Sequence, residues 1–192
     1  MKIFTYFYEK VMAWSRLPNA FWYLNALSFA ESSFFPIPPD VMLAPMSLAK
    51  PDKAWGYALT TTIASVLGGL LGYIIGITAF DFIQPHLQAS SYWESFNTAK
   101  VWFEQYGFWA IFIAGFSPIP YKVFTITAGT LSMALLPFII ASLIGRGARF
   151  FMVAGLMKWG GASMEQNLKK YVDRIGWATV ALVAIAVIAF KF

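Results

Sequence analysis

The chain has no cysteine, a single histidine and few charged residues. The absence of cysteine removes thiol chemistry and cysteine ligands for zinc. The lone His86 stands beside Pro85, away from any candidate ligand or nucleophile, so neither a metal site nor a catalytic triad is indicated. The phosphate-cradling pattern GxxxxGK is also missing. We therefore expect no enzyme activity, no metal and no cofactor.

The shortage of charge also sets the class of protein. Of 192 residues, 12% are charged, 59% apolar and 19% aromatic, whereas soluble domains carry about 25% charged residues. The composition predicts an integral membrane protein that forms a single all-α unit. Its net charge of +5 comes from basic residues scattered between apolar runs, which favours an effect of membrane topology and argues against nucleic-acid binding.

Two short segments repeat one another at an offset of 82 residues, FFPIPPDV at 34–41 and FSPIPYKV at 116–123. Asp40 in the first copy is replaced by Lys122 in the second. Paired proline-broken segments in matching positions of two halves indicate a transport site built from discontinuous helices. The prolines expected to break the helices are Pro36, Pro38, Pro39, Pro118 and Pro120.

The apolar runs beside these breaks are too short to span a membrane. The run at 20–30 would rise about 16 Å as a helix, roughly half of the ~30 Å hydrocarbon core. A run that enters, breaks and returns predicts a re-entrant hairpin. The full predicted order is an interfacial helix at 3–17, a first re-entrant hairpin at 20–49, a transmembrane helix at 54–80, an interfacial connector at 81–107, a second re-entrant hairpin at 108–135, and transmembrane helices at 136–157 and 175–190.

Two further patterns refine this layout. Small residues recur every four positions in the first span, at Ala64, Gly68, Gly72 and Gly76, which predicts a face for close helix packing. With a cytoplasmic N-terminus, nine basic residues fall inside and two outside, in agreement with the positive-inside rule. One span then separates the hairpins, so they enter from opposite membrane faces as an inverted repeat.

Five ionisable residues fall at membrane depth, where each costs about 2.5–3.5 kcal/mol unless paired or hydrated. We expect them to share a polar cavity, and the alternative is that some are only neutralising ion pairs. Two acids and three bases leave one positive charge over, which suits an anionic head group such as a phosphate. The five are Glu31, Asp40, Lys122, Arg146 and Arg149.

Individual roles follow from position. Arg146 and Arg149 lie three apart on one predicted helix, an arrangement able to clamp a phosphate. Desolvation at the tip of an apolar half-helix favours a protonated carboxyl group, so Glu31 is the first candidate for a proton carrier and Asp40 the second. Asp40 and Lys122 occupy equivalent places, so the two tips should meet near mid-membrane. Whether these two pair directly stays open, because the other three ionisable residues compete as partners.

The segment ESSFFPIPPD at 31–40 resembles the E-N-x-x-x-P-x-P-G-E/D signature of the DedA family, also called the SNARE-associated or VTT-domain family. The segment PIPYKVFTITAGTLSM at 118–133 resembles the second signature of that family, P-x-x-R-T-F-x-x-x-x-A-G-x-x-x-M. Together with the PIPYK and GRGARF segments, the resemblance is strongest to a YqaA-like branch and covers about residues 20–160.

The resemblance implies a multi-pass protein of the bacterial inner membrane with two opposed re-entrant hairpins. Members are implicated in flipping or scrambling lipids, including undecaprenyl phosphate and phospholipids, often with dependence on the proton motive force. By motif, Glu31 and Asp40 match the functional acids, and Lys122 stands in place of the arginine of the second signature. The chain departs from the family at Ser117, near which members carry a further arginine, and at Arg149, which replaces a tryptophan.

The combined prediction is a transporter of an anionic lipid whose partners are membrane lipids and, for coupling, protons. Two alternatives stay open: a proton- or ion-coupled transporter of a small soluble solute, and a membrane-organising protein that transports nothing. A homo-oligomeric state also stays open.

Overall fold

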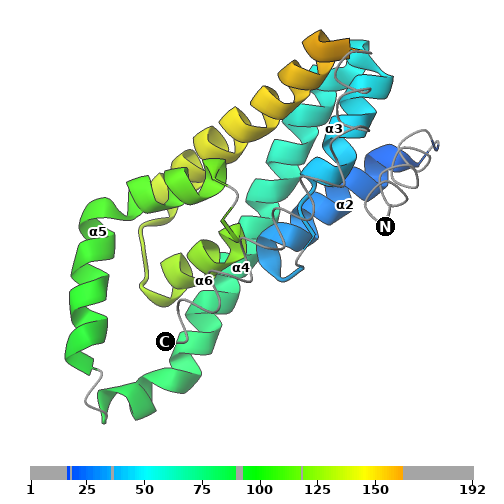
Figure 1. The fold of residues 1–192 in the computed structure, drawn as a ribbon. Coiled ribbons are helices and arrows are strands. Elements are labelled where there is room, and N and C mark those ends of the chain that lie inside the picture. Colours follow the sequence, from blue (N-terminus) through cyan, green and yellow to red (C-terminus); the bar gives the residue numbers. More distant parts are fainter. Residues whose placement is uncertain (1–16, 18, 36, 90–92, 118, 162–192) are drawn as a thin grey trace, which may run out of the picture.

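A computed structural model of the chain describes residues 17, 19–35, 37–89, 93–117 and 119–161 (Figure 1). Within these ranges the secondary structure is helical and contains no strand, so the all-α prediction is confirmed for this part. The expected interfacial helix at 3–17, apart from Leu17, and the expected span at 175–190 lie outside the described residues.

The helices of the described residues differ widely in length. The elements are α2 (Ala20–Ser33), α3 (Asp40–Ala49), the short 3-10 helix η1 (Pro51–Lys53), α4 (Ala54–Gln88), α5 (Trp93–Phe116), α6 (Tyr121–Thr130) and a further helix, Leu135–Gly161. By length and composition, the helical stretches Pro51–Phe82 and Leu135–Gly161 can each cross a membrane, with mean hydropathies of 2.0 and 1.5. The α3 helix is apolar but shorter.

A proline stands directly before each of the short helices α3 and α6. At the first break, between α2 and α3, the backbone N–H groups of Phe34 and Phe35 both donate to the carbonyl oxygen of Ala30 at 2.8 Å. These hydrogen bonds end α2. The α3 helix starts directly after Pro39, and α6 starts directly after Pro120. Proline suits this place because its fixed φ matches the helix and its missing N–H is not needed there.

The stretch expected to form an interfacial connector, 81–107, is helical wherever the structure describes it. The α4 helix continues through Pro85 to Gln88, and α5 runs from Trp93 past residue 107 without a break. Aromatic stacking supports this longer course, since the rings of Phe80 and Phe96 lie 4.9 Å apart between the end of α4 and the start of α5. The mixed polar and aromatic composition of this stretch is therefore that of exposed helix.

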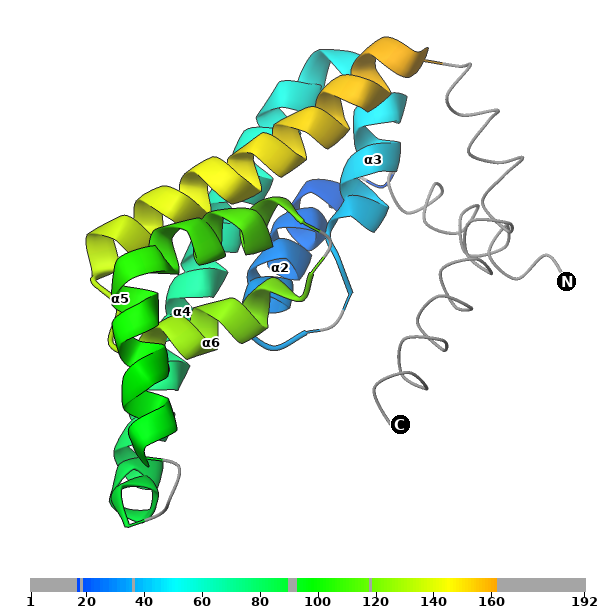
Figure 2. The same cartoon turned by 60° about the vertical axis from the view of Figure 1, so that its left-hand side comes forward.

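The two long helices lie side by side and run in opposite directions (Figure 2). Thr62 on α4 lies opposite Gly147, where an added Cβ would be 3.6 Å from the threonine methyl group. Further along α4, the ring of Tyr73 lies 5.1 Å from that of Phe138, which comes earlier in the Leu135–Gly161 helix. The first half of the chain, up to the end of α4, and the second half, from α5 on, are therefore antiparallel at their long helices.

The small-residue face of α4 receives one short helix from each half. A Cβ added at Gly68 would overlap the carbonyl oxygen of Phe29 on α2, and one added at Gly76 would overlap that of Ile126 on α6. The predicted close packing along this face is confirmed. Because α6 belongs to the second half and α4 to the first, the two halves interlock.

Two apolar cores result, at different positions along the paired long helices. The first gathers side chains of α2, α3, the start of α4 and the end of the Leu135–Gly161 helix, and the second those of α5, α6, the middle of α4 and the start of the Leu135–Gly161 helix. On α4, Ser65 lies between Ala58 of the first core and Tyr73 of the second. Buried polar residues are thus concentrated between the cores.

We predict that Gly76→Ala will destabilise the protein by about 1–3 kcal/mol, because the added methyl group overlaps a backbone carbonyl that cannot move aside. Gly56→Ala is the matched control, since a Cβ at Gly56 meets no atom within 4 Å. Thermal unfolding in detergent measures both. Equal midpoints for the two variants would contradict the close packing of α4 and α6.

Candidate functional site

The five ionisable residues singled out from the sequence come together between the two cores. They are carried by α2, α3, α6 and the Leu135–Gly161 helix, and all five line one cavity of about 190 Å³. The rest of its lining comes from the two proline-containing breaks: Phe35, Pro38, Ile119 and Pro120. Of the other predicted break prolines, Pro39 is buried, and Pro36 and Pro118 lie outside the described residues.

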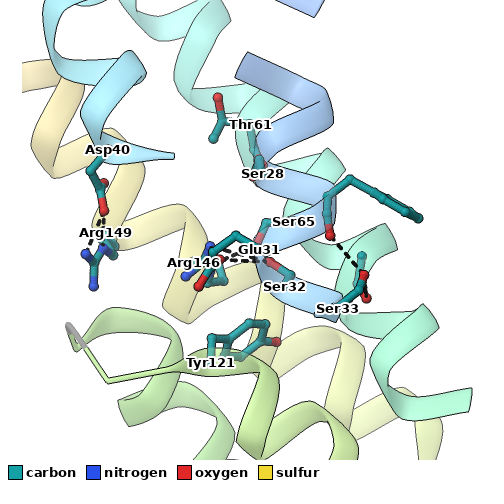
Figure 3. A network of polar contacts seen from close by, with 12 residues as sticks. Ser28, Glu31, Ser32, Ser33, Asp40, Thr61, Ser65, Tyr121, Arg146 and Arg149 are labelled. Carbon is teal, nitrogen blue, oxygen red and sulfur yellow. Dashed lines mark hydrogen bonds and ion pairs between the residues drawn. The ribbon is translucent and has the colours of Figure 1, made fainter. Parts of the chain in front are cut away.

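The most buried pair joins Glu31 at the end of α2 to Arg146 (Figure 3). The guanidinium Nη2 of Arg146 lies 2.6 Å from Oε2 of Glu31, and only 3% and 11% of the respective side chains are exposed. Arg146 Nε also donates to Ser65 Oγ at 2.6 Å, and Ser65 and Ser32 share a hydrogen bond of 2.7 Å. Because a buried charge is tolerated only when paired and hydrogen-bonded, this network explains how Arg146 can lie so deep.

Aromatic rings enclose the same guanidinium group. Its central carbon lies 4.9 Å from the ring centroid of Tyr121 and 4.6 Å from that of Phe150. The Tyr121 hydroxyl group donates to Ser142, which fixes the ring. Cation–π contacts of this kind add stabilisation in a desolvated place. Arg146 is therefore held by carboxylate, hydroxyl and aromatic groups together.

A second, more accessible pair joins Asp40 at the start of α3 to Arg149. Nη2 and Nε of Arg149 lie 2.6 Å and 3.1 Å from Oδ2 of Asp40. The side chain of Asp40 is 21% exposed and that of Arg149 is 15% exposed. Arg149 Nη1 also donates to the carbonyl oxygen of Ser117. Arg149 thus ties the first break of the chain to the second.

Lys122 differs from the two arginines. Its Nζ donates to the carbonyl oxygen of Phe34 at 3.3 Å, and among the described residues it has no carboxylate partner within ion-pair distance. The repeat did not decide whether Lys122 pairs directly with Asp40, and in the structure Asp40 binds Arg149 instead. The tips of the two expected hairpins do lie close together, since Lys122 beside the second break contacts Phe34 in the first break.

The net charge of the cavity is therefore carried by one residue. Two carboxylates are matched by two guanidinium groups, and Lys122 supplies the remaining positive charge. The residue also lies in the first turn of α6, where the helix dipole disfavours a cation and favours an anion. The N-terminus of α3 borders the same cavity through Asp40 and Pro38. A small anionic group would compensate this positive charge.

Each guanidinium group binds a different carboxylate in this structure, so a joint phosphate clamp by Arg146 and Arg149 stays a prediction. Among the residues that the structure describes, no group of three potential His, Cys, Asp or Glu ligands occurs.

The groups that complete the site were not predicted from the sequence. Ser32 and Ser65 are small polar residues that fit helix interfaces without a hydropathy signal, and Tyr121 lies within PIPYK, where it was noted only as part of the motif. One pattern could have indicated a shared polar seam between α2 and α4. Polar residues are four positions apart on both helices, at Ser28 and Ser32 and at Thr61 and Ser65.

Comparison with known proteins identifies relatives for the whole chain. The VTT domain profile matches residues 37–159. The chain is 48% identical over its full length to an "Uncharacterized protein" of Haemophilus influenzae that it also covers completely. It is 28% identical to the inner membrane protein YqaA of Escherichia coli over 71% of the chain and 93% of that protein. No solved structure matches the chain significantly.

A further relative, from Staphylococcus aureus, is named undecaprenyl phosphate transporter A. The two sequences are 33% identical over 93 residues, which is 45% of this chain and 46% of the relative.

We predict that Glu31→Gln and Arg146→Gln will each destabilise the protein by about 3–5 kcal/mol, because each leaves an uncompensated buried charge or donor. The double variant should recover part of the loss, which a double-mutant cycle on thermal stability in detergent will detect. Strictly additive effects would show that the two side chains do not depend on each other.

Proposed function

Because the chain belongs to the VTT-domain, or DedA, family, as its sequence signatures predicted, we propose that it is a membrane transporter that moves an anionic lipid through the cavity between the two breaks. The candidate substrates are phospholipids and polyprenyl phosphates. The name of the S. aureus relative supports a lipid with a phosphate head group. The name of the E. coli relative supports a location in the bacterial inner membrane.

The single observation that carries this proposal is the positive charge of Lys122 inside the shared cavity, which no carboxylate of the described residues matches. A phosphate bound there would receive a charge-assisted hydrogen bond from the ammonium group. The N-terminal ends of the α3 and α6 helix dipoles would add to the attraction. The two breaks that border the cavity would let the lipid tail remain in the membrane while the head group passes.

In the proposed membrane arrangement, α2–α3 and the end of α5 with α6 are re-entrant hairpins that enter from opposite faces. The antiparallel long helices and the interlocked halves support this arrangement. The N-terminus would be cytoplasmic, as the distribution of basic residues indicates.

Proton coupling fits the ion pairs of the site. Uptake of a proton by Glu31 or Asp40 would break its pair and free a guanidinium group for the phosphate. Asp40 is the more accessible of the two, and its Oδ1 is buried without a hydrogen-bond partner among the described residues. In this proposal Asp40 is the first candidate for the proton carrier, since loss of the Glu31 pair would also dismantle the most buried network.

Labelling of single cysteines introduced into this cysteine-free chain tests the topology. We predict that cysteines at Lys50 and at Ala89 will react with impermeant reagents from opposite sides of the membrane, the first from the cytoplasm. Labelling of both positions from the same side would contradict a single crossing by α4.

Transport is tested by reconstituting the protein into vesicles that contain a fluorescent anionic or zwitterionic lipid, with and without a pH gradient. We predict that the anionic lipid is moved faster and that Lys122→Gln slows it at least about tenfold, as expected for one lost charge-assisted hydrogen bond. Lys100→Gln, on the α5 helix away from the cavity, is the matched control.

The outcomes separate the rival functions. Equal rates for wild-type protein and empty vesicles would contradict lipid transport. Phosphate analysis of lipid extracted from the purified protein then distinguishes a solute transporter, which should carry no stoichiometric lipid phosphate. Full function in cells of variants neutralised at Asp40 and Lys122 would instead favour a membrane-organising role.

A further inference from the structure

A second and larger cavity lies at the other end of the first core. It has a volume of about 460 Å³ and is bordered by the start of α2, the end of α3, η1 and the start of α4. It shares no lining residue with the cavity that holds the five ionisable residues.

The lining of this cavity is partly apolar and partly charged. Leu17, Phe21 and Met46 supply apolar side chains, called here the apolar wall, while Lys50, Lys53 and one acid, Asp52, are exposed lining residues. The charged residues of the lining therefore sum to one positive charge. Within the part of the chain that the structure describes, neither lysine takes part in an ion pair.

Aromatic residues mark this end of the molecule as the level of a membrane surface. The rings of Trp55 and Trp159 lie 5.8 Å apart, and the Nζ of Lys158 lies 5.5 Å from the Trp55 ring centroid. Trp22 and Tyr23, at the start of α2, are 70% and 57% exposed. Tryptophan and tyrosine gather where hydrocarbon meets head groups, so the cavity lies at head-group depth.

We infer that this cavity holds the head group of an anionic phospholipid from the surrounding leaflet, independently of transport. The lysines would bind its phosphate, and the first acyl carbons would lie against Leu17, Phe21 and Met46. Basic pockets between helices at the membrane surface recognise anionic lipids in this way. A soluble anion lacks the acyl chain that the apolar wall requires.

Gly56 offers a way to close the cavity without disturbing the fold. The residue lines the cavity, and a side chain added there meets no atom within 4 Å. Gly56→Leu should therefore fill the space while the helix stays intact. The double variant Lys50→Gln/Lys53→Gln removes the charge and leaves the space open.

The test titrates phosphatidylglycerol into the full chain held in phosphatidylcholine nanodiscs and follows bound lipid by native mass spectrometry and the thermal midpoint. Wild-type protein should retain phosphatidylglycerol and gain stability. Gly56→Leu and the double lysine variant should each bind roughly tenfold more weakly. Lys100→Gln, far from the cavity, should behave as wild type.

The transport variant Lys122→Gln keeps this inference separate from the proposed function, because it should still show the stabilisation by phosphatidylglycerol even if transport is lost. Unchanged binding in both cavity variants would overturn the inference. An equal stabilisation by glycerol 3-phosphate, which has no acyl chains, would also overturn it by showing that the cavity takes a soluble anion.

Discussion

The buried ion pair between Glu31 and Arg146 is the interaction on which the rest of the structure depends. Neither side chain could stay at this depth alone, and Ser32 and Ser65 add hydrogen bonds to Glu31 Oε2 and Arg146 Nε. Since Glu31 belongs to the first half of the chain and Arg146 to the second, the pair also fixes how the halves meet. The two apolar cores then pack on either side of it.

Opposite charge is divided between the halves in a regular way. Both acids of the cavity come from the first half, all three bases come from the second, and both ion pairs join one half to the other. The repeat at an offset of 82 residues is thus similar in backbone and complementary in charge. Two bases hold the halves together, and in the proposed function Lys122 binds the ligand. This division connects the stability of the protein to its proposed function.

Hydropathy identified the five charged residues because a charge within an apolar run needs a compensating environment, whatever the fold. The choice of partner could not be predicted in the same way. Asp40 pairs with Arg149, 109 residues away, and the pairing depends on how each helix is rotated about its axis. Sequence spacing placed both arginines on one helix face but could not show that each meets a different acid.

Helix boundaries show the same limit. The breaks at proline were predictable because proline acts through its own backbone. The course of residues 81–107 was not, since a mixed aromatic and polar segment is compatible with both a loop and an exposed helix, and stacking of Phe80 on Phe96 favours the helix. Serines of the central network carry no signal of their own, because a serine in an apolar helix is tolerated with or without a partner.

The central claim is that one unmatched positive charge, on Lys122, holds an anionic head group in the cavity. The most direct measurement is the amount of lipid phosphorus that remains with the protein after purification and extensive detergent exchange. The account predicts that Lys122→Gln retains less phosphorus than the wild type by about one equivalent, provided that the second cavity is blocked by Gly56→Leu in both proteins. Equal phosphorus in the two proteins would contradict it.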